Sequence, residues 1–260
     1  QSNIFAAMLV SYTVSVTCIW TYILMTTPLN FFRSPAMLYF LASGCLQPLF
    51  ARALYYEALI RLGVSRAGPL RGAEPLFATA IAVVILHEQP AVPVYVGTLL
   101  IVGSIWAISS GQSEKSNWQL FDIFLPLGAA LVSAVSQTLR KQGLNISPDP
   151  FVAAATVTSV TLTLLMIFLF ATKRTGQLRT GRGSFLFFFI AALVALLAQI
   201  SNFIALGQAD VSVIIPLLNT TPLFTVLFSS LFLRRMETIS PRIILGAALM
   251  VAGVITITSR

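Results

Sequence analysis

Long runs of apolar residues alternate with short polar links along the whole chain. A helix needs about 20 apolar residues to cross the hydrocarbon core of a membrane, which is ~30 Å thick. Runs of this length predict nine transmembrane helices, at roughly residues 3–25, 36–60, 68–87, 92–110, 119–139, 151–172, 185–206, 212–233 and 241–259. We expect helices because the runs lack the two-residue alternation of a barrel, and a chain in lipid must satisfy its own backbone groups.

The polar links that separate these runs are short, and they cover residues 61–66, 87–91, 111–118, 140–150, 173–184, 207–211 and 234–240. Glycine and proline occur in or beside them, as is usual where helices end. None of the links is long enough to form a soluble domain. The most polar link near the middle of the chain is 111–118, and we expect a domain boundary there.

The composition supports a membrane protein. Hydrophobic residues make up 57% of the 260 residues and charged residues only 9%, with a mean hydropathy of +0.89. A soluble protein carries about 25% charged residues. We therefore expect an all-α polytopic protein in the lipid bilayer, most simply in the plasma membrane. The net charge of +8 then reports loop charges and orientation, and it predicts no nucleic-acid partner.

One stretch of the sequence occurs twice. The segment from Pro69 to Phe77 and the segment from Pro216 to Phe224 share a frame of two prolines, each followed by leucine, with Leu-Phe after the second. At the same offset Ala51, Ala58, Leu59, Val64, Ser65 and Leu86 also recur. Chance matches of Ala and Leu are common in apolar segments, but the proline frame is not. The sequence therefore predicts an internal duplication.

The duplication predicts more than the helix count does. The second copy, residues 118–260, contains five predicted spans with the proline pair on the fourth. The first copy, residues 1–112, contains four spans with the pair on the third, which predicts a further helix before Gln1. Repeats of five helices enter the membrane from opposite sides. We expect an inverted repeat of five-helix units, nine transmembrane helices of ten, as in many secondary transporters.

Both halves end with a proline-bearing helix, a short polar turn and a closing helix with spaced glycines. The first half has Pro75, Leu86-His87-Glu88, Gly97 and Gly103; the second has Pro222, Leu233-Arg234-Arg235, Gly246 and Gly253. This layout resembles the EamA-like branch of the drug/metabolite transporter superfamily. The resemblance implies ten helices in two halves around a central pathway. The second half departs from the family pattern, because Arg235 replaces the glutamate of the turn and Glu237 follows it.

The repeated prolines are candidates for helix kinks and gating, since proline frees a backbone carbonyl and bends a helix: Pro69, Pro75, Pro216 and Pro222. Such kinks serve helix packing, the wall of a substrate cavity, or both. The glycines of the closing helices are typical of close helix packing.

Charged residues away from the ends of a span are costly, and four occur in the predicted spans: Arg52, Glu57, Arg71 and Glu74. Their counterparts in the second copy are Gln199, Ile204, Leu218 and Thr221, so the duplication kept the prolines and lost the charges. This difference favours a substrate-binding role over a structural one. From their depths, we expect each arginine to meet a carboxylate on the neighbouring helix in one buried cluster. Further candidates for substrate binding are Tyr55, Tyr56, Asn202, Asn219, Thr220 and Thr221.

These features favour a secondary transporter or exporter of a small metabolite that works by alternating access. Two arginines and two glutamates give a nearly neutral pathway, which favours an amino-acid-like or amphipathic solute. There is no phosphate-binding loop for ATP. A buried glutamate is able to bind protons, so proton coupling and exchange both stay open.

Two other functions compete with transport: an intramembrane lipid-modifying enzyme and a non-transporting membrane protein. The enzyme would need paired acidic motifs or a nucleophile with its base, and Asp122, Asp149 and Asp210 are isolated. One histidine and two separated cysteines do not make the usual zinc or haem ligand sets. We therefore predict no catalytic residues, no metal and no cofactor.

Two arguments about orientation disagree. The face with links 61–66, 111–118, 173–184 and 234–242 carries Arg61, Arg66, Lys115, Lys173, Arg174, Arg179, Arg182, Arg234, Arg235 and Arg242. The other face carries only Arg33, Arg140, Lys141 and Arg260. The positive-inside rule makes the first face cytoplasmic. The family resemblance implies cytoplasmic termini, which places the same face outside.

Cysteine labelling decides between these orientations. In a variant with Cys18 and Cys45 replaced by serine, a cysteine introduced at Thr175 lies in the link at 173–184. The loop charges favour a cytoplasmic location, so an impermeant maleimide added to intact cells should not label it, whereas permeabilised cells should show labelling. Labelling of intact cells would support the orientation that the resemblance implies.

Overall fold

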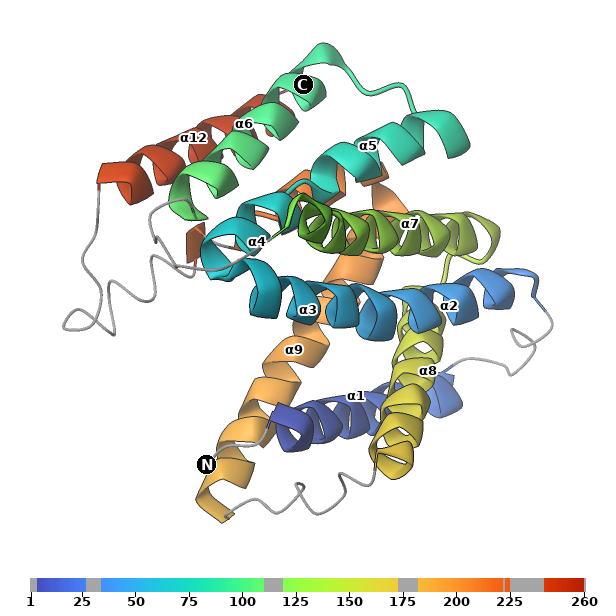
Figure 1. The fold of residues 1–260 in the computed structure, drawn as a ribbon. Helices are drawn as coiled ribbons and strands as arrows, with labels where there is room; N and C mark the ends of the chain where they lie inside the picture. Colours follow the sequence, from blue (N-terminus) through green and yellow to red (C-terminus); the bar gives the residue numbers. More distant parts are fainter. Residues whose placement is uncertain are drawn as a thin grey trace. The chain divides into compact units, whose positions relative to one another are not determined.

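The computed structural model describes residues 4–26, 34–109, 119–172, 182–221, 223–224 and 241–259. Within these ranges the chain forms helices and no strand (Figure 1). The helices form two compact units, each built from two separate parts of the chain. The first unit is Gln1–Leu49 with Leu139–Gln208, and the second is Phe50–Thr138 with Ala209–Arg260.

Among the described helices, four are long and apolar enough to cross a membrane by length and composition: Ala7–Thr26, Phe121–Ile146, Pro150–Ala171 and Phe185–Gln208. Shorter apolar helices accompany them at Ala36–Cys45, Glu74–Ile85, Val92–Ala107 and Ile244–Thr258. The all-helical fold and the apolar helices agree with an integral, multi-pass membrane protein.

The first unit is organised around helix α8 (Pro150–Ala171). This helix packs against α1 (Ile4–Thr26), α2 (Ala36–Cys45) and α9 (Arg182–Gln208). Its N-terminus is capped by Asp149, whose carboxylate accepts the N–H groups of Phe151 and Val152. This cap satisfies donors that have no partner within the helix. Residues 152–158 are all buried, so α8 is the centre of this unit.

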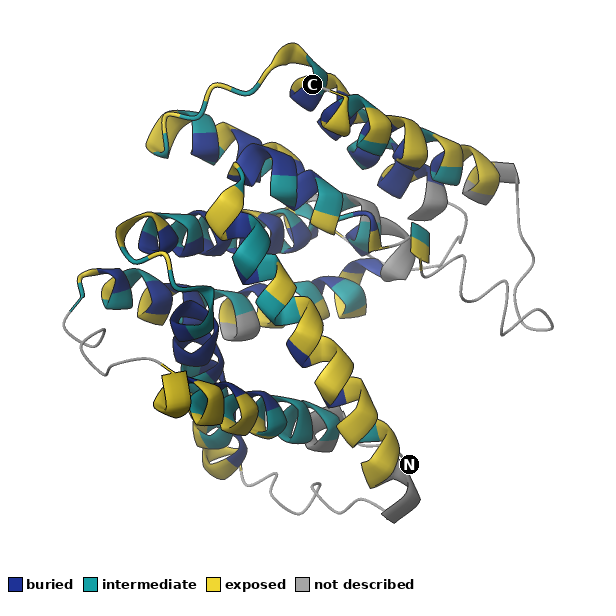
Figure 2. Ribbon diagram, turned by 180° about the vertical axis from the view of Figure 1, so that it is seen from behind, coloured by how far each residue is buried: buried dark blue, intermediate teal, exposed yellow. Residues whose placement is uncertain are grey.

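Helix α9 leaves a broad apolar surface exposed within its unit (Figure 2). Large side chains along it are 52–74% exposed, among them Phe185, Leu186, Phe187 and Leu197. An apolar surface of this extent is unfavourable in water and favourable in hydrocarbon. The pattern is what a helix with one lipid-facing side requires.

Helix α7 (Phe124–Ile146) extends further at its C-terminal end than the sequence predicted. A polar link was expected at 140–150, but the helix continues to Ile146 and α8 begins at Pro150. Arg140 therefore belongs to the helix and is only 7% exposed. It is a buried charge and not a loop charge, so it does not count toward orientation.

The second unit contains α3 (Arg52–Leu62), α4 (Val64–Arg71), α5 (Glu74–Ile85), α6 (Val92–Ser109), the 3-10 turn η3 (Leu120–Ile123), α10 (Val211–Leu218) and α12 (Pro241–Thr258). A π-helical segment, η2 (Leu46–Ala51), precedes α3 and contains Pro48. Proline has no N–H, so it interrupts the regular helical bonding at this point.

Helices α6 and α12 lie side by side (Figure 1), and glycine allows their close approach. A Cβ at Gly97 would lie 2.7 Å from the carbonyl oxygen of Gly253, and a Cβ at Gly253 would lie 2.8 Å from the carbonyl oxygen of Gly97. Both values are below van der Waals contact. The predicted packing role is therefore confirmed for these glycines, whereas a Cβ at Gly103 would meet nothing within 4 Å.

This asymmetry between the glycines gives a stability prediction. Replacing Gly97 or Gly253 by Ala should destabilise the protein by about 1–3 kcal/mol, because the new methyl group meets backbone that cannot move aside. The matched control Gly103→Ala should be neutral or stabilising by up to about 1 kcal/mol through helix propensity. Thermal unfolding of the purified variants checks this. Equal loss of stability in all three would contradict the close approach.

Candidate functional site

The proline-bearing segment is broken at the same place in both copies of the repeat. In the first copy α4 ends at Arg71, a turn follows at Gly72-Ala73, and α5 begins at Glu74. In the second copy α10 ends at Leu218, and a turn follows at Asn219-Thr220. These positions correspond exactly at the repeat offset, so the turns occupy equivalent places in the two copies.

Backbone hydrogen bonds around the two breaks correspond one by one. Gly72 donates to the carbonyl of Gly68, as Asn219 donates to that of Ile215. The same holds for two further pairs of equivalent bonds: Ala73 to Leu70 and Thr220 to Leu217, then Leu76 to Ala73 and Leu223 to Thr220. The break is therefore a repeated structural feature and not an irregularity of one copy.

Proline explains why the helix breaks here. A continuous helix would need the N–H of residues 75 and 222 to donate to the carbonyls of Arg71 and Leu218, and proline has no N–H. Pro75 lies buried at the start of α5, where a missing N–H costs least. In the first copy the predicted bend is thus a turn followed by a new helix. The side chain of Pro69 and the whole of Pro222 lie outside the described residues.

In the second copy, three predicted site residues donate side-chain hydrogen bonds to backbone carbonyls at the break. The Thr221 hydroxyl donates to the carbonyl of Leu218 at 2.9 Å, which is the carbonyl that a residue with an N–H at position 222 would have bonded. Asn219 donates through Nδ2 to Ile215 at 2.9 Å, and Thr220 donates through its hydroxyl to Leu217 at 2.7 Å. These side chains stabilise the turn, and their oxygens can still accept hydrogen bonds.

In the first copy, an ion pair spans the same break. Arg71 donates through Nη1 to the Glu74 carboxylate at 2.7 Å and through Nη2 to the Ser133 hydroxyl of α7 at 2.7 Å. Glu74 is 6% exposed, so this carboxylate is buried against its counter-ion. Charge pairing is what allows both groups to remain at this depth.

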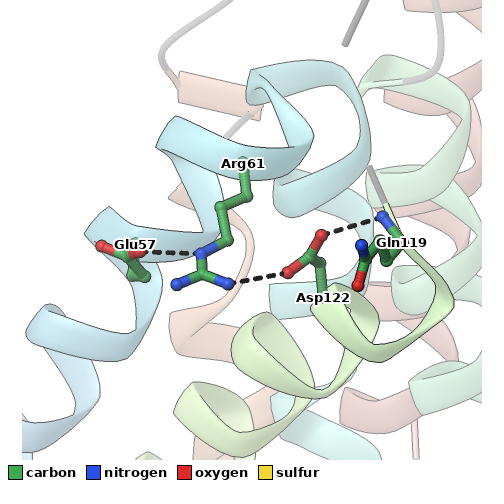
Figure 3. A network of polar contacts seen from close by, with 4 residues as sticks. All are labelled: Glu57, Arg61, Gln119 and Asp122. Carbon is green, nitrogen blue, oxygen red and sulfur yellow. Dashed lines mark hydrogen bonds and ion pairs between the residues drawn. The ribbon is translucent and has the colours of Figure 1, made fainter. Parts of the chain in front are cut away.

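The other predicted charges do not join this pair. Glu57 accepts from Arg61 at 2.7 Å, and Arg61 also donates to Asp122 at 3.2 Å (Figure 3). Asp122 in turn accepts the backbone N–H of Gln119 at 2.9 Å, which fixes the turn before α7. The side chains of Glu57 and Arg61 are 43% and 52% exposed. Asp122 is buried, but the two residues of α3 are largely exposed, so this network lies at the surface between α3 and the turn before α7.

The expected four-residue cluster is therefore wrong. Arg52 is exposed and forms no ion pair with any residue that the structure describes. The prediction used depth along the helix axis, but depth does not fix the direction in which a side chain points. The i,i+3 relation of Arg71 and Glu74 did identify one real pair. Of the two tyrosines, Tyr55 packs against an apolar cluster of the unit, and Tyr56 is 49% exposed.

Glu88 joins the two copies, a role that the sequence did not predict. Its carboxylate accepts the N–H of Val211 at 2.8 Å and the N–H of Ser212 at 3.0 Å, so it caps the N-terminus of α10. The preceding residue, His87, has a φ of 55°, a left-handed turn that ends α5. The Leu-His-Glu turn after a helix was the available signal. At the equivalent place in the second copy the sequence has Arg235.

Polar groups of the first unit form contacts that the sequence did not predict. Arg140 donates to the Ser43 hydroxyl at 2.8 Å, and Lys141 donates to the carbonyl of Leu206 at 2.9 Å. Asn202, a predicted site residue on α9, has a buried side-chain oxygen with no hydrogen-bond donor among the described residues, as does Gln47. A buried acceptor left without a donor costs about 1–3 kcal/mol.

The two ion pairs differ in burial, so their removal should differ in cost. Glu74→Gln leaves the Arg71 guanidinium without its carboxylate and should destabilise the protein by about 1–3 kcal/mol, less than a fully buried pair because Arg71 is 22% exposed. The matched control Glu57→Gln should cost less than about 1 kcal/mol. Denaturant unfolding of both variants tests this. Equal costs would show that the Arg71–Glu74 pair is not buried in the membrane.

Comparisons with known proteins agree with this architecture. The model of the EamA-like transporter family matches residues 2–110 and, a second time, residues 120–259. Similar folds occur among solved structures, where 28 chains match. One of them, described only as the crystal structure of a protein, has a TM-score of 0.79 at 15% identity, and the match covers 100% of this chain and 88% of that chain. No curated protein sequence matches.

Because the sequence identity is only 15%, the likeness to that solved structure supports the fold alone. The family match extends over nearly the whole sequence and falls into two consecutive repeats. The all-helical fold and the repeated break in the proline-bearing helix are consistent with that match. The chain belongs to the EamA-like transporter family of the drug/metabolite transporter superfamily.

Proposed function

We propose that this protein is a secondary transporter that moves a small metabolite across the plasma membrane by alternating access. Its two repeats, residues 1–112 with four spans and residues 118–260 with five, are inverted copies of a five-helix unit in this proposal. Membership of a transporter family supports transport as the function. The chemistry of the site points to an amino-acid-like or amphipathic solute.

The observation that carries this proposal is the helix break that both repeats share. Broken helices in transporters present backbone groups at the depth of the substrate, because regular helices bond all their own N–H and C=O groups. Here α4 and α5 on one side and α10 on the other supply two such breaks within one unit, and α5 packs against α10.

The two breaks offer different chemistry to a solute. The first offers the Arg71–Glu74 ion pair, and the second offers the oxygens of Asn219, Thr220 and Thr221. A solute with a cationic group can compete with Arg71 for Glu74, and an anionic group can compete for Arg71. Tyr55 adds an aromatic surface. Arg52, Tyr56 and Glu57 are less suitable, because they are exposed or belong to the network at the helix ends.

The driving force in this proposal is a solute or ion gradient. In this proposal transport is coupled either to protons or to the exchange of one solute for another. Counterflow in proteoliposomes tests the proposal directly. Vesicles loaded with unlabelled amino acids, polyamines or nucleosides should accumulate the same labelled compound for at least one class, faster than protein-free vesicles. Failure for every class would count against transport of such solutes.

Restoring the missing N–H groups tests the role of the breaks. Pro75→Ala and Pro222→Ala allow position 75 to bond the Arg71 carbonyl and position 222 to bond the Leu218 carbonyl, so the helix can become continuous. We expect transport to fall by about tenfold, which corresponds to a shift of about 1.4 kcal/mol between transport states.

The matched control is Pro93→Ala, because Pro93 lies in the first turn of α6, where an N–H has no partner within the helix. This variant should transport at the wild-type rate. Folding of all three variants is checked by thermal unfolding. Wild-type transport by both Pro75→Ala and Pro222→Ala would remove the breaks from the mechanism.

A further inference from the structure

Glu88 connects the ends of two helices that belong to different repeats. Its own N–H donates to the carbonyl of Ala82 at 3.2 Å, across the last turn of α5. Its carboxylate accepts the N–H of Val211 at 2.8 Å through Oε1 and the N–H of Ser212 at 3.0 Å through Oε2. These two N–H groups have no acceptor within α10 itself. We call these contacts of Glu88 with Ala82, Val211 and Ser212 the α5–α10 joint.

The backbone before Glu88 is shaped for this contact. His87 has a φ of 55°, and it is the one non-glycine residue with a positive φ among those that the structure describes. Residues with a Cβ seldom adopt this left-handed conformation, because the Cβ comes too close to the following carbonyl oxygen. The chain therefore accepts an unfavourable conformation at the residue that sets the direction of Glu88.

Helix α10 depends on a cap from outside its own sequence. It has only eight residues, and Pro216 removes one more N–H from its interior, so few internal hydrogen bonds hold it. Asp210 stands at its N-cap position, yet the Asp210 side chain makes no capping hydrogen bond. Glu88, 123 residues from Val211, supplies the cap and places a negative charge at the positive end of the helix dipole. The first repeat thus fixes the start of α10.

The joint also determines where the two helix breaks lie relative to each other. Helix α5 packs against α10, and the end of α5 lies at the start of α10, so the two run in opposite directions. With twelve residues in α5 and eight in α10, the break before α5 lies ~18 Å from the joint and the break after α10 ~12 Å from it. A movement of α10 at the joint therefore shifts residues 219–221 relative to the Arg71–Glu74 ion pair.

We propose that Glu88 is a positioning residue for the transported solute. It acts through α10, which it holds in register against α5, so that the two breaks keep the spacing that a solute bound to both requires. A displacement of binding groups by about 1 Å is enough to weaken such an interaction. This inference rests on the proposed function, because the solute concerned is the one that the two breaks bind.

Counterflow kinetics separate a positioning role from a purely structural one. Glu88→Ala removes both acceptor oxygens, so we expect the KM of the transported solute to rise by about fivefold or more, with less than about a twofold change in the maximal rate per folded protein. Glu88→Gln keeps one acceptor oxygen and should show a smaller rise. A purely structural cap would change the amount of folded protein and leave the KM unchanged.

Asp149 provides a matched control. Its carboxylate also accepts two backbone N–H groups, those of Phe151 and Val152, but it caps the helix that it directly precedes. Asp149→Ala should lower the thermal stability, as the loss of a cap does, and leave the KM at the wild-type value. An equal rise of the KM in Asp149→Ala and Glu88→Ala would show that the KM follows stability, and would overturn the proposal.

Thiol labelling tests the joint without any solute. Ser212 is fully buried, and its hydroxyl has no partner among the described residues, so Ser212→Cys removes no side-chain hydrogen bond that the structure shows. With Cys18 and Cys45 replaced by serine, N-ethylmaleimide should label the Ser212→Cys variant slowly. Adding Glu88→Ala should raise the labelling rate by about fivefold or more, because the start of α10 is released, whereas adding Asp149→Ala should not.

The outcomes distinguish this inference from the proposed function. Unchanged labelling with Glu88→Ala, or faster labelling with an unchanged KM, would overturn the positioning role while transport persists. If the wild type shows no counterflow of any solute class, the proposed function is rejected and the positioning role with it, and faster labelling would then support the joint alone. If Glu88→Ala does not fold, Glu88→Gln serves for both measurements.

Discussion

Inside a bilayer no water is available to a backbone carbonyl, so every proline that removes an N–H creates a need for another donor. Pro75 and Pro222 create that need at equivalent points of the two repeats. In both repeats the chain closes one helix with the same turn, and in the first repeat α5 starts directly after it. The position of the break follows from this requirement.

The two copies then differ in the side chains placed beside the break. In the second copy Thr221 supplies a hydroxyl to the Leu218 carbonyl. In the first copy the equivalent position is Glu74, which pairs with Arg71 across the turn. The backbone hydrogen bonds of the break are thus the same in both copies, but the side chains beside it are neutral in the second copy and charged in the first.

Contacts between the copies hold the second unit together. Gly97 and Gly253 allow the closing helices to touch, and the Glu88 carboxylate caps α10 from the other repeat. A cap of this kind combines hydrogen bonds with the favourable end of a helix dipole. It also ties the end of α5 to the start of the broken helix. The second repeat has Arg235 at the position equivalent to Glu88, so it lacks the carboxylate that makes this cap.

Much of the fold was predictable because its determinants are local. Apolar runs predict helices, and the proline frame predicted that the segments around Pro75 and Pro222 would be equivalent. The site was less predictable, since it depends on the direction of each side chain. Glu57 was expected to meet Arg71, but Arg61 on its own helix is closer. Arg140 was assigned to a link because it is charged, and only packing against Ser43 shows that it is buried.

Hydrogen exchange at the two breaks tests the central claim most directly. The account predicts that amides at Gly72–Glu74 and Asn219–Thr221 exchange faster than those of the flanking helical turns in lipid nanodiscs, and that a transported solute slows both sets together. Exchange at the breaks that is as slow as in the flanking turns, and unchanged by a solute that counterflow shows to be transported, would contradict it.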